Sequence, residues 1–301
     1  MVEGGPDQPL RGAARPAIDF LSMFQRKRTG SILCPSCGRL TGVADEVCAN
    51  CGRRNPGMWG LTSILGNAGR TVPFDQVVIG GTVFLYLCML VVDPEGIGKG
   101  FSLFNLLPPS QESLLRFGAS GGVPVWHFGR WWTLLSAGWL HGNLLHIAFN
   151  LSWLRMLAPE VAELFGPSRM VILFTVSSAF AFLLTSTLGR FYLFGGAQLT
   201  VGASAAILGL LGALVWYGRA TGSRLVGGQA WSWALGCIVF GFFFPMVDNW
   251  GHLGGFAGGY VAAHFLDPRR PERPAHTAGA ILCLVATVAA IVLSLVVPLP
   301  R

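Results

Sequence analysis

The sequence predicts an all-α protein that crosses a membrane several times. Hydrophobic residues make up 52% of the 301-residue chain, charged residues only 12%, and the mean hydropathy is +0.56. A globular protein of this length needs more polar residues than this to cover its surface. A helix needs about 20 apolar residues to span a bilayer. Runs of roughly this kind, some of them short or interrupted by glycine, occupy 75–93, 142–158, 168–188, 202–218, 229–245, 250–266 and 278–298.

The basic residues predict the orientation of these spans. The net charge of +7 could suit nucleic acid, but the 21 lysines and arginines are divided unevenly between the two sides of the bilayer. Sixteen lie in the N-terminal region or in segments on the same side of the bilayer as that region, and five lie on the other side. Because positive residues collect on the cytoplasmic side, we expect a cytoplasmic N-terminus, an extracytoplasmic C-terminus and a plasma (inner) membrane location. The first seventy residues contain no apolar segment of the signal-peptide kind, so we expect no cleavable leader.

Two Cys-x-x-Cys-Gly motifs lie before the first span. Cys34 and Cys37 belong to the first motif, and Cys48 and Cys51 belong to the second. Two thiolates in each motif can bind one metal ion, and the glycine permits the tight turn behind them, so together the motifs predict a four-sulfur structural zinc site. Two disulfides are the alternative, which a cytoplasmic location disfavours. Zinc would stabilise a module too small to bury a core of its own.

These features divide the chain into five parts. The first part is rich in glycine, proline and arginine, which is typical of disorder. The lone cysteines of the spans, Cys88, Cys237 and Cys283, are expected to pack as small apolar residues. We expect a disordered tail at 1–30, a zinc-ribbon-like module at 31–55, a linker at 56–74, the membrane core at 75–267, and a loop with a seventh transmembrane helix at 268–301.

A few polar residues within the spans predict a buried site. His146 and Asn150 stand four apart and therefore share one helix face, with His141 at the outer end of the same span. Ser204 opens the fourth span and His252 opens the sixth. With the N-terminus inside, all three of these spans begin at the outer face. Because polar side chains in a bilayer usually face the interior of a helix bundle, we expect these groups to converge.

Small residues provide a way for the fourth and sixth spans to come close. Gly251, Gly255 and Gly259 recur every four residues in the sixth span, and the fourth offers Gly209 and Gly212. This spacing allows close helix contact in membranes, although it is also common in packing without catalysis. A close contact would let a histidine take the proton of a serine hydroxyl, which is a weak nucleophile by itself.

The expected chemistry is peptide hydrolysis by a serine and a histidine. Ser204 would attack, and His252 would act first as base and then as acid. The side chains of His146 and Asn150 and the backbone N–H of Ser204 could stabilise the oxyanion. Asp248, four residues before His252, is a weaker candidate for orienting the imidazole. The chain has neither His-Glu-x-x-His nor a pair of aspartates within spans, which argues against zinc and aspartyl intramembrane proteases.

Taken together, these motifs resemble the rhomboid family of intramembrane serine proteases. The resemblance covers roughly 75–270 and rests on His141, His146 and Asn150, on Gly202-Ala203-Ser204, and on the Gly-His-Leu-Gly-Gly sequence around His252. It implies a six-helix core with the seventh span appended, a Ser204–His252 dyad, an oxyanion site from His146 and Asn150, and cleavage of transmembrane protein substrates. His141 and Gly202 would support that site, and no catalytic cofactor is implied.

The chain departs from the family pattern at two positions. Ala205 stands where the family usually has glycine, and Thr133 stands where an arginine usually follows a tryptophan. The loop 94–130 is expected to be a partly embedded flap or an ordinary interfacial loop. The fifth span, with Trp233 and Phe243, is expected to form a mobile wall beside the substrate entrance, so that smaller residues at both positions raise turnover.

Two other functions remain open at this point. A proteolytically inactive rhomboid-like protein could bind or escort membrane clients, but inactive relatives typically lose the serine or histidine that this chain keeps. A membrane-tethered nucleic-acid binder would depend on a few arginines of the zinc-ribbon-like module and is a weaker possibility.

Overall fold

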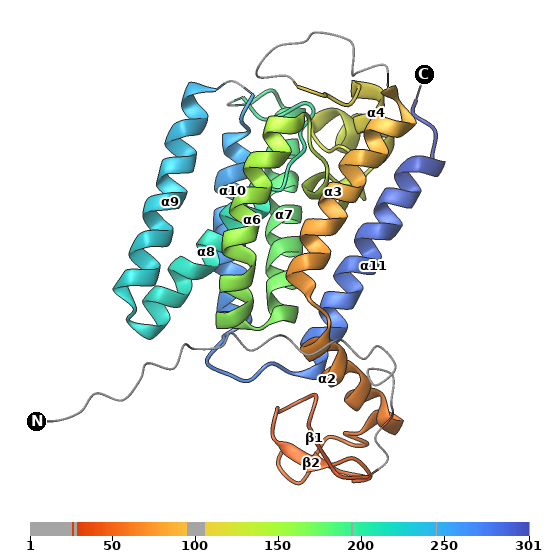
Figure 1. Ribbon diagram of the computed structural model, residues 1–301, viewed down its shortest axis with the longest axis vertical. Helices are drawn as coiled ribbons and strands as arrows, with labels where there is room; N and C mark the ends of the chain where they lie inside the picture. Colours follow the sequence, from red (N-terminus) through yellow and green to blue (C-terminus); the bar gives the residue numbers. More distant parts are fainter. Residues whose placement is uncertain (1–25, 27–28, 95–105, 194, 245, 301) are drawn as a thin grey trace, which may run out of the picture.

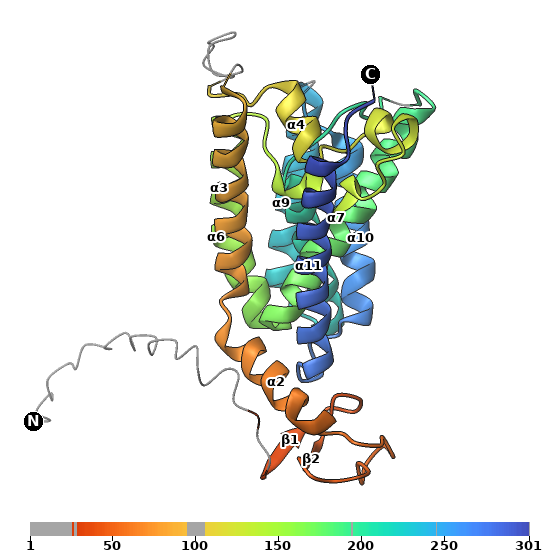
Figure 2. The same ribbon diagram turned by 90° about the vertical axis from the view of Figure 1, so that its right-hand side faces the viewer.

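The computed structural model describes residues 26, 29–94, 106–193, 195–244 and 246–300 (Figure 1). The tail predicted to be disordered, 1–30, lies almost entirely outside these residues. Helices dominate the described part of the chain, and they form a bundle above a small two-stranded module (Figures 1 and 2). Five of the described helices are long and apolar enough to cross a bilayer, namely α3 (Phe74–Val92), α7 (Pro167–Arg190), α8 (Ser204–Thr221), α9 (Arg224–Phe243) and α11 (Pro274–Val296).

Two further helices complete the seven predicted spans. α6 (Leu144–Phe165) carries the charged residues Arg155, Glu160 and Glu163, and α10 (Asn249–Phe265) has only 17 residues. Both run alongside the long helices of the bundle (Figure 1). α6 continues past its predicted end at 158, through Pro159, because Val161 and Phe165 are still buried in the core. The chain is therefore an integral membrane protein, as predicted.

α8 lies at the centre of the bundle. Inside the molecule, 72% of its span is buried, compared with 17% for α9, which lies at one side. The contact between α8 and α10 is more extensive than that between any other pair of elements in the described structure. A side chain at Gly255 or Gly259 of α10 would collide with the backbone of Ala205 or Gly209 of α8. The predicted close approach of these helices is therefore present, with backbone against backbone.

The loop between α3 and α6 is built from short helices. Its described part contains α4 (Gln111–Phe117), η3 (Val123–His127), α5 (Thr133–Ser136) and η4 (Ala137–Trp139), whereas 95–105 lies outside the described residues. This loop and the end of α11 lie at the end of the bundle opposite the small module (Figure 1). An antiparallel bridge between Ser120 and Thr200 joins the loop to the segment that precedes α8.

The small module lies beneath the bundle and touches it. Strands β1 (Ser31–Leu33) and β2 (Leu40–Gly42) form an antiparallel pair. The segment expected to be a linker contains η1 (Met58–Gly60) and α2 (Leu61–Thr71), and α2 packs against α11. α2 is amphipathic rather than uniformly apolar, which explains why hydropathy alone did not mark it.

α11 contacts the rest of the molecule at both ends. Near its C-terminal end the buried Arg130 donates to the carbonyl of Ser294 at 2.5 Å, and the indole N–H of Trp132 donates to the Ser294 hydroxyl at 2.9 Å. At the other end Arg273 donates to the carbonyl of Ser36 in the small module at 2.6 Å. The buried Arg169 of α7 holds the loop before α11 by donating to two of its carbonyls.

Candidate functional site

Ser204 begins α8, directly after a tight segment that two hydrogen bonds hold in place. Gly202 has φ +134°, a conformation that side chains strongly disfavour. Its N–H donates to the carbonyl of Ala137 at 3.0 Å, and the N–H of Ala203 points to Nε2 of His141 at 3.4 Å. The loop between α3 and α6 thus fixes where α8 begins. Ser204 itself is partly exposed.

His146 and Asn150 come from α6, on the face turned toward this segment. A Cβ atom added at Gly202 would lie 2.7 Å from Nε2 of His146 and 3.7 Å from the hydroxyl oxygen of Ser204. Both side chains therefore lie beside Gly202. Nδ2 of Asn150 donates to the carbonyl of His146 at 2.8 Å, and Oδ1 of Asn150 is buried without a partner within the described structure. The ring of His141 lies against that of His146, with 4.9 Å between centroids.

His252 lies one turn before Gly255, on the face of α10 that packs on α8. The imidazole is buried, and its Nδ1 has no hydrogen-bond partner among the described residues. It is near enough to His146 to interact with it electrostatically. Within the described part of the chain, no hydrogen bond joins His252 to the hydroxyl of Ser204. Such bonds are often long before substrate binds and tighten in the complex. The five predicted site residues therefore lie at the adjoining ends of α6, α8 and α10.

Within the described residues, the carboxylate of Asp248 makes no hydrogen bond to Nδ1 of the His252 imidazole. The carboxylate instead accepts three hydrogen bonds, from the backbone N–H of Gly251 and from the hydroxyls of Thr185 and Thr200. Sequence reasoning considered Asp248 only as a partner of the imidazole and did not single out either threonine. A polar residue inside an otherwise apolar span is a signal that could have pointed to Thr185. Thr200 lies before the fourth span and carries no such signal.

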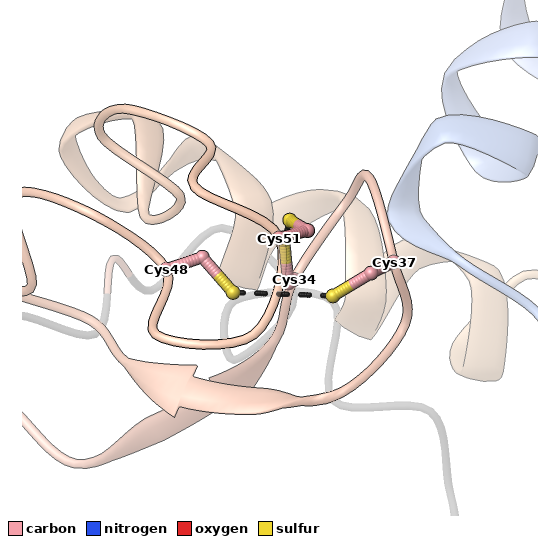
Figure 3. Close-up of side chains that lie close together, drawn as sticks. All are labelled: Cys34, Cys37, Cys48 and Cys51. Carbon is pink, nitrogen blue, oxygen red and sulfur yellow. Dashed lines mark hydrogen bonds between the residues drawn. The ribbon is translucent and has the colours of Figure 1, made fainter.

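The four cysteines of the small module form one cluster. Their sulfur atoms all lie within 4.8 Å of one another, with Cys34 at 3.7 Å from Cys51 and Cys37 at 3.9 Å from Cys48 (Figure 3). Sulfurs about 2.3 Å from a central ion in a tetrahedron are separated by about 3.8 Å, which these distances match. They are far too long for disulfides. The cluster therefore has the geometry of a site that can hold a metal ion, and zinc fits its all-sulfur donor set.

The two motifs have the same backbone geometry. In the first, the N–H of Gly38 donates to the carbonyl of Cys34 at 2.8 Å, and in the second the N–H of Gly52 donates to that of Cys48 at 2.9 Å. A hydrogen bond from the backbone of Arg39 lowers the pKa of Cys37 to about 6. Backbone hydrogen bonds of this kind favour the thiolate, which is the form that binds metals.

Comparison with known proteins finds a family match over the segment that contains α6, α8 and α10. Residues 128–269 match the family model described as Rhomboid domain. This range contains all five residues predicted to form the membrane site. It leaves out α11 and the small module that carries the four cysteines, which we call the cysteine module. Both lie outside the matched domain in this chain.

Individual relatives support the same assignment. The chain is 31% identical over 155 residues to the rhomboid protease GluP of Bacillus subtilis, a match covering 50% of this chain and 29% of that protein. It is 32% identical over 166 residues to RHOMBOID-like protein 1 of Arabidopsis thaliana, covering 52% and 40%. A match of 25% identity over 204 residues with Rhomboid-like protease 2 of Toxoplasma gondii covers 64% and 67%. The chain spans less than half the length of the first two relatives. Residues 128–269 are thus similar to a rhomboid domain, and these relatives are named as rhomboid or rhomboid-like proteins.

Proposed function

We propose that this protein is an intramembrane serine endopeptidase that cleaves transmembrane segments of other proteins. The observation that carries the proposal is the close contact between α8 and α10. Gly255 lies against the backbone of Ala205. This contact supports a pairing of Ser204 with His252, because Ser204 directly precedes Ala205 and His252 lies one turn before Gly255. A hydroxyl beside a buried imidazole is the minimal arrangement for serine hydrolysis.

The proposed reaction proceeds through an acyl-enzyme. His252 takes the hydroxyl proton as Ser204 attacks the scissile carbonyl carbon, and the carbonyl oxygen becomes an oxyanion. The backbone N–H of Ser204 and the side chains of His146 and Asn150 would donate to that oxyanion. When the peptide bond breaks, His252 returns the proton to the leaving amine. A water molecule, deprotonated by His252, then hydrolyses the ester and restores Ser204.

Cleavage of a transmembrane substrate tests this proposal. We expect the purified protein in detergent to cleave a labelled single-span substrate, and we expect Ser204→Ala and His252→Ala each to abolish turnover. Asn150→Ala should reduce it by a factor on the order of 10²–10³, the usual effect of losing one oxyanion donor. Binding of the substrate without cleavage in the wild type would instead support an inactive protein that binds or escorts membrane clients.

We further propose that the cysteine module holds one structural zinc ion on the cytoplasmic side. Cys34→Ser should lose the metal, whereas Cys88→Ser, which changes a cysteine of α3, should retain it. Elemental analysis of the purified protein measures this, with one zinc per chain expected for the wild type. Disulfides between the four cysteines, or a metal content unchanged in Cys34→Ser, would contradict the assignment.

The proposed orientation has the N-terminus in the cytoplasm and the C-terminus outside. It rests on the uneven distribution of basic residues and on the position of the cysteine module at the end of the bundle opposite the end of α11 (Figure 1). A protease-sensitive tag after Arg301 should be cut from outside intact cells, whereas a tag before Met1 should be protected. The reverse pattern would overturn the orientation.

A further inference from the structure

Asp248 contacts three separate parts of the molecule that surround the proposed site. Oδ1 accepts from the backbone N–H of Gly251 and from the hydroxyl of Thr185, both at 2.9 Å, and Oδ2 accepts from the hydroxyl of Thr200 at 3.1 Å. Gly251 belongs to α10, Thr185 to α7, and Thr200 to the segment before α8. One carboxylate therefore joins two helices and a loop.

The contact with Gly251 fixes the start of the helix that carries His252. Asp248 is the residue before α10, and its side chain caps the helix by accepting from a free N–H of the first turn. A side chain at Gly251 would lie 2.9 Å from the carboxylate, so the glycine makes room for it. The backbone N–H of His252 also donates to the carbonyl of Asp248, at 3.0 Å.

The contact with Thr200 fixes the segment that leads to Ser204. Thr200 precedes Ser204 by four residues, just as Asp248 precedes His252 by four residues. Thr185 holds the same segment from the other side, because its hydroxyl accepts from the N–H of Ala197 at 3.1 Å. Each of the two threonine hydroxyls therefore connects the carboxylate to the segment before α8.

We infer that Asp248 is a positioning residue that sets the distance between the helix carrying Ser204 and the helix carrying His252. The inference rests on the proposed function, in which those two side chains react together. Asp248 touches neither the substrate nor the reacting atoms in this scheme. Its role is to make the outer ends of α8 and α10 move as one unit while the glycine contacts hold them further down.

The first test does not depend on activity. Hydrogen exchange of the backbone should become faster in both 197–204 and 248–254 when Asp248→Ala is introduced, and it should stay unchanged at the inner ends of α8 and α10. Asp248→Asn should retain most of the protection, because its amide oxygen can still accept from Gly251 and Thr185 and its amide nitrogen can donate to the Thr200 hydroxyl. Faster exchange in only one of the two segments would show that Asp248 does not link them.

The second test measures cleavage of a transmembrane substrate. Asp248→Ala should lower kcat by a factor of about 10–100, as expected for a displacement on the order of 1 Å, with KM unchanged because the substrate-binding surfaces are intact. Thr200→Val should lower kcat in the same way by a smaller factor, and Asp248→Asn should recover most of the loss. If Asp248→Ala does not fold, Thr200→Val decides the question.

Wild-type kcat in Asp248→Ala or in Thr200→Val would overturn the inference, as would a change confined to KM. Absence of cleavage by the wild-type protein would instead overturn the proposed protease function. Hydrogen exchange would still decide whether Asp248 couples the two segments in that case.

Discussion

The contact between α8 and α10 makes a quantitative prediction at Gly255. A methyl group at this position would overlap the carbonyl oxygen of Ala205 and would lie 2.8 Å from its carbonyl carbon, whereas ordinary contact begins at 3.4 Å. Backbone cannot rotate away as a side chain can, so Gly255→Ala must separate the two helices by about 1 Å. Because Ser204 precedes Ala205 directly, the same displacement would move it away from His252.

We expect Gly255→Ala to lower kcat by a factor of about 100, the usual effect of a 1 Å misplacement of reacting groups. Overpacking at this contact should also reduce the free energy of unfolding by about 1–3 kcal/mol. The assay is cleavage of a labelled transmembrane substrate, well below the melting temperature of each variant, together with thermal unfolding in the same detergent.

The matched control is Gly80→Ala in α3. A side chain at Gly80 would meet nothing within 4 Å, so this substitution should leave kcat unchanged and should stabilise the helix slightly, by up to about 1 kcal/mol. Full activity in Gly255→Ala, or an equal loss in Gly80→Ala, would refute the reasoning that close backbone contact positions the two groups.

Two further predictions concern contacts at the edges of the core. Arg130→Ala should reduce the free energy of unfolding by about 3 kcal/mol, since the carbonyls of Leu115 and Ser294 lose the buried guanidinium that donates to them. A denaturant titration that leaves the midpoint unchanged would argue against this. Trp233→Ala should raise turnover about five-fold, because it removes a ring contact between α9 and Trp153 of α6, 5.6 Å between centroids, worth about 1 kcal/mol. Phe243 is 75% exposed, so smaller residues at this position should have little effect on turnover. Equal increases in turnover for substitutions at Trp233 and at Phe243 would contradict this distinction.

The sequence predicted the features that depend on local patterns. Seven helices follow from long apolar runs, because a bilayer requires that length of hydrophobic residues. The cysteine cluster follows from the spacing within each motif, and the contact between α8 and α10 follows from glycines such as Gly255 and Gly259, which recur on one helix face.

Contacts between distant segments could not be predicted in the same way. Arg130 and Ser294 are 164 residues apart, and neither hydropathy nor spacing indicates that they meet. The position of Thr200 opposite Asp248 depends on how a loop folds over the ends of three helices. α2 escaped notice because an amphipathic helix of 11 residues lacks the uniform hydrophobicity of a span.

Covalent labelling by a fluorophosphonate tests the central claim most directly, because this reagent reacts with a serine hydroxyl only when a neighbouring base activates it. We predict one adduct per chain, located at Ser204 by mass spectrometry, with no labelling of Ser204→Ala or His252→Ala. Labelling that persists in Ser204→Ala, or a folded wild-type protein that does not react at all, would contradict a catalytic pair formed by α8 and α10.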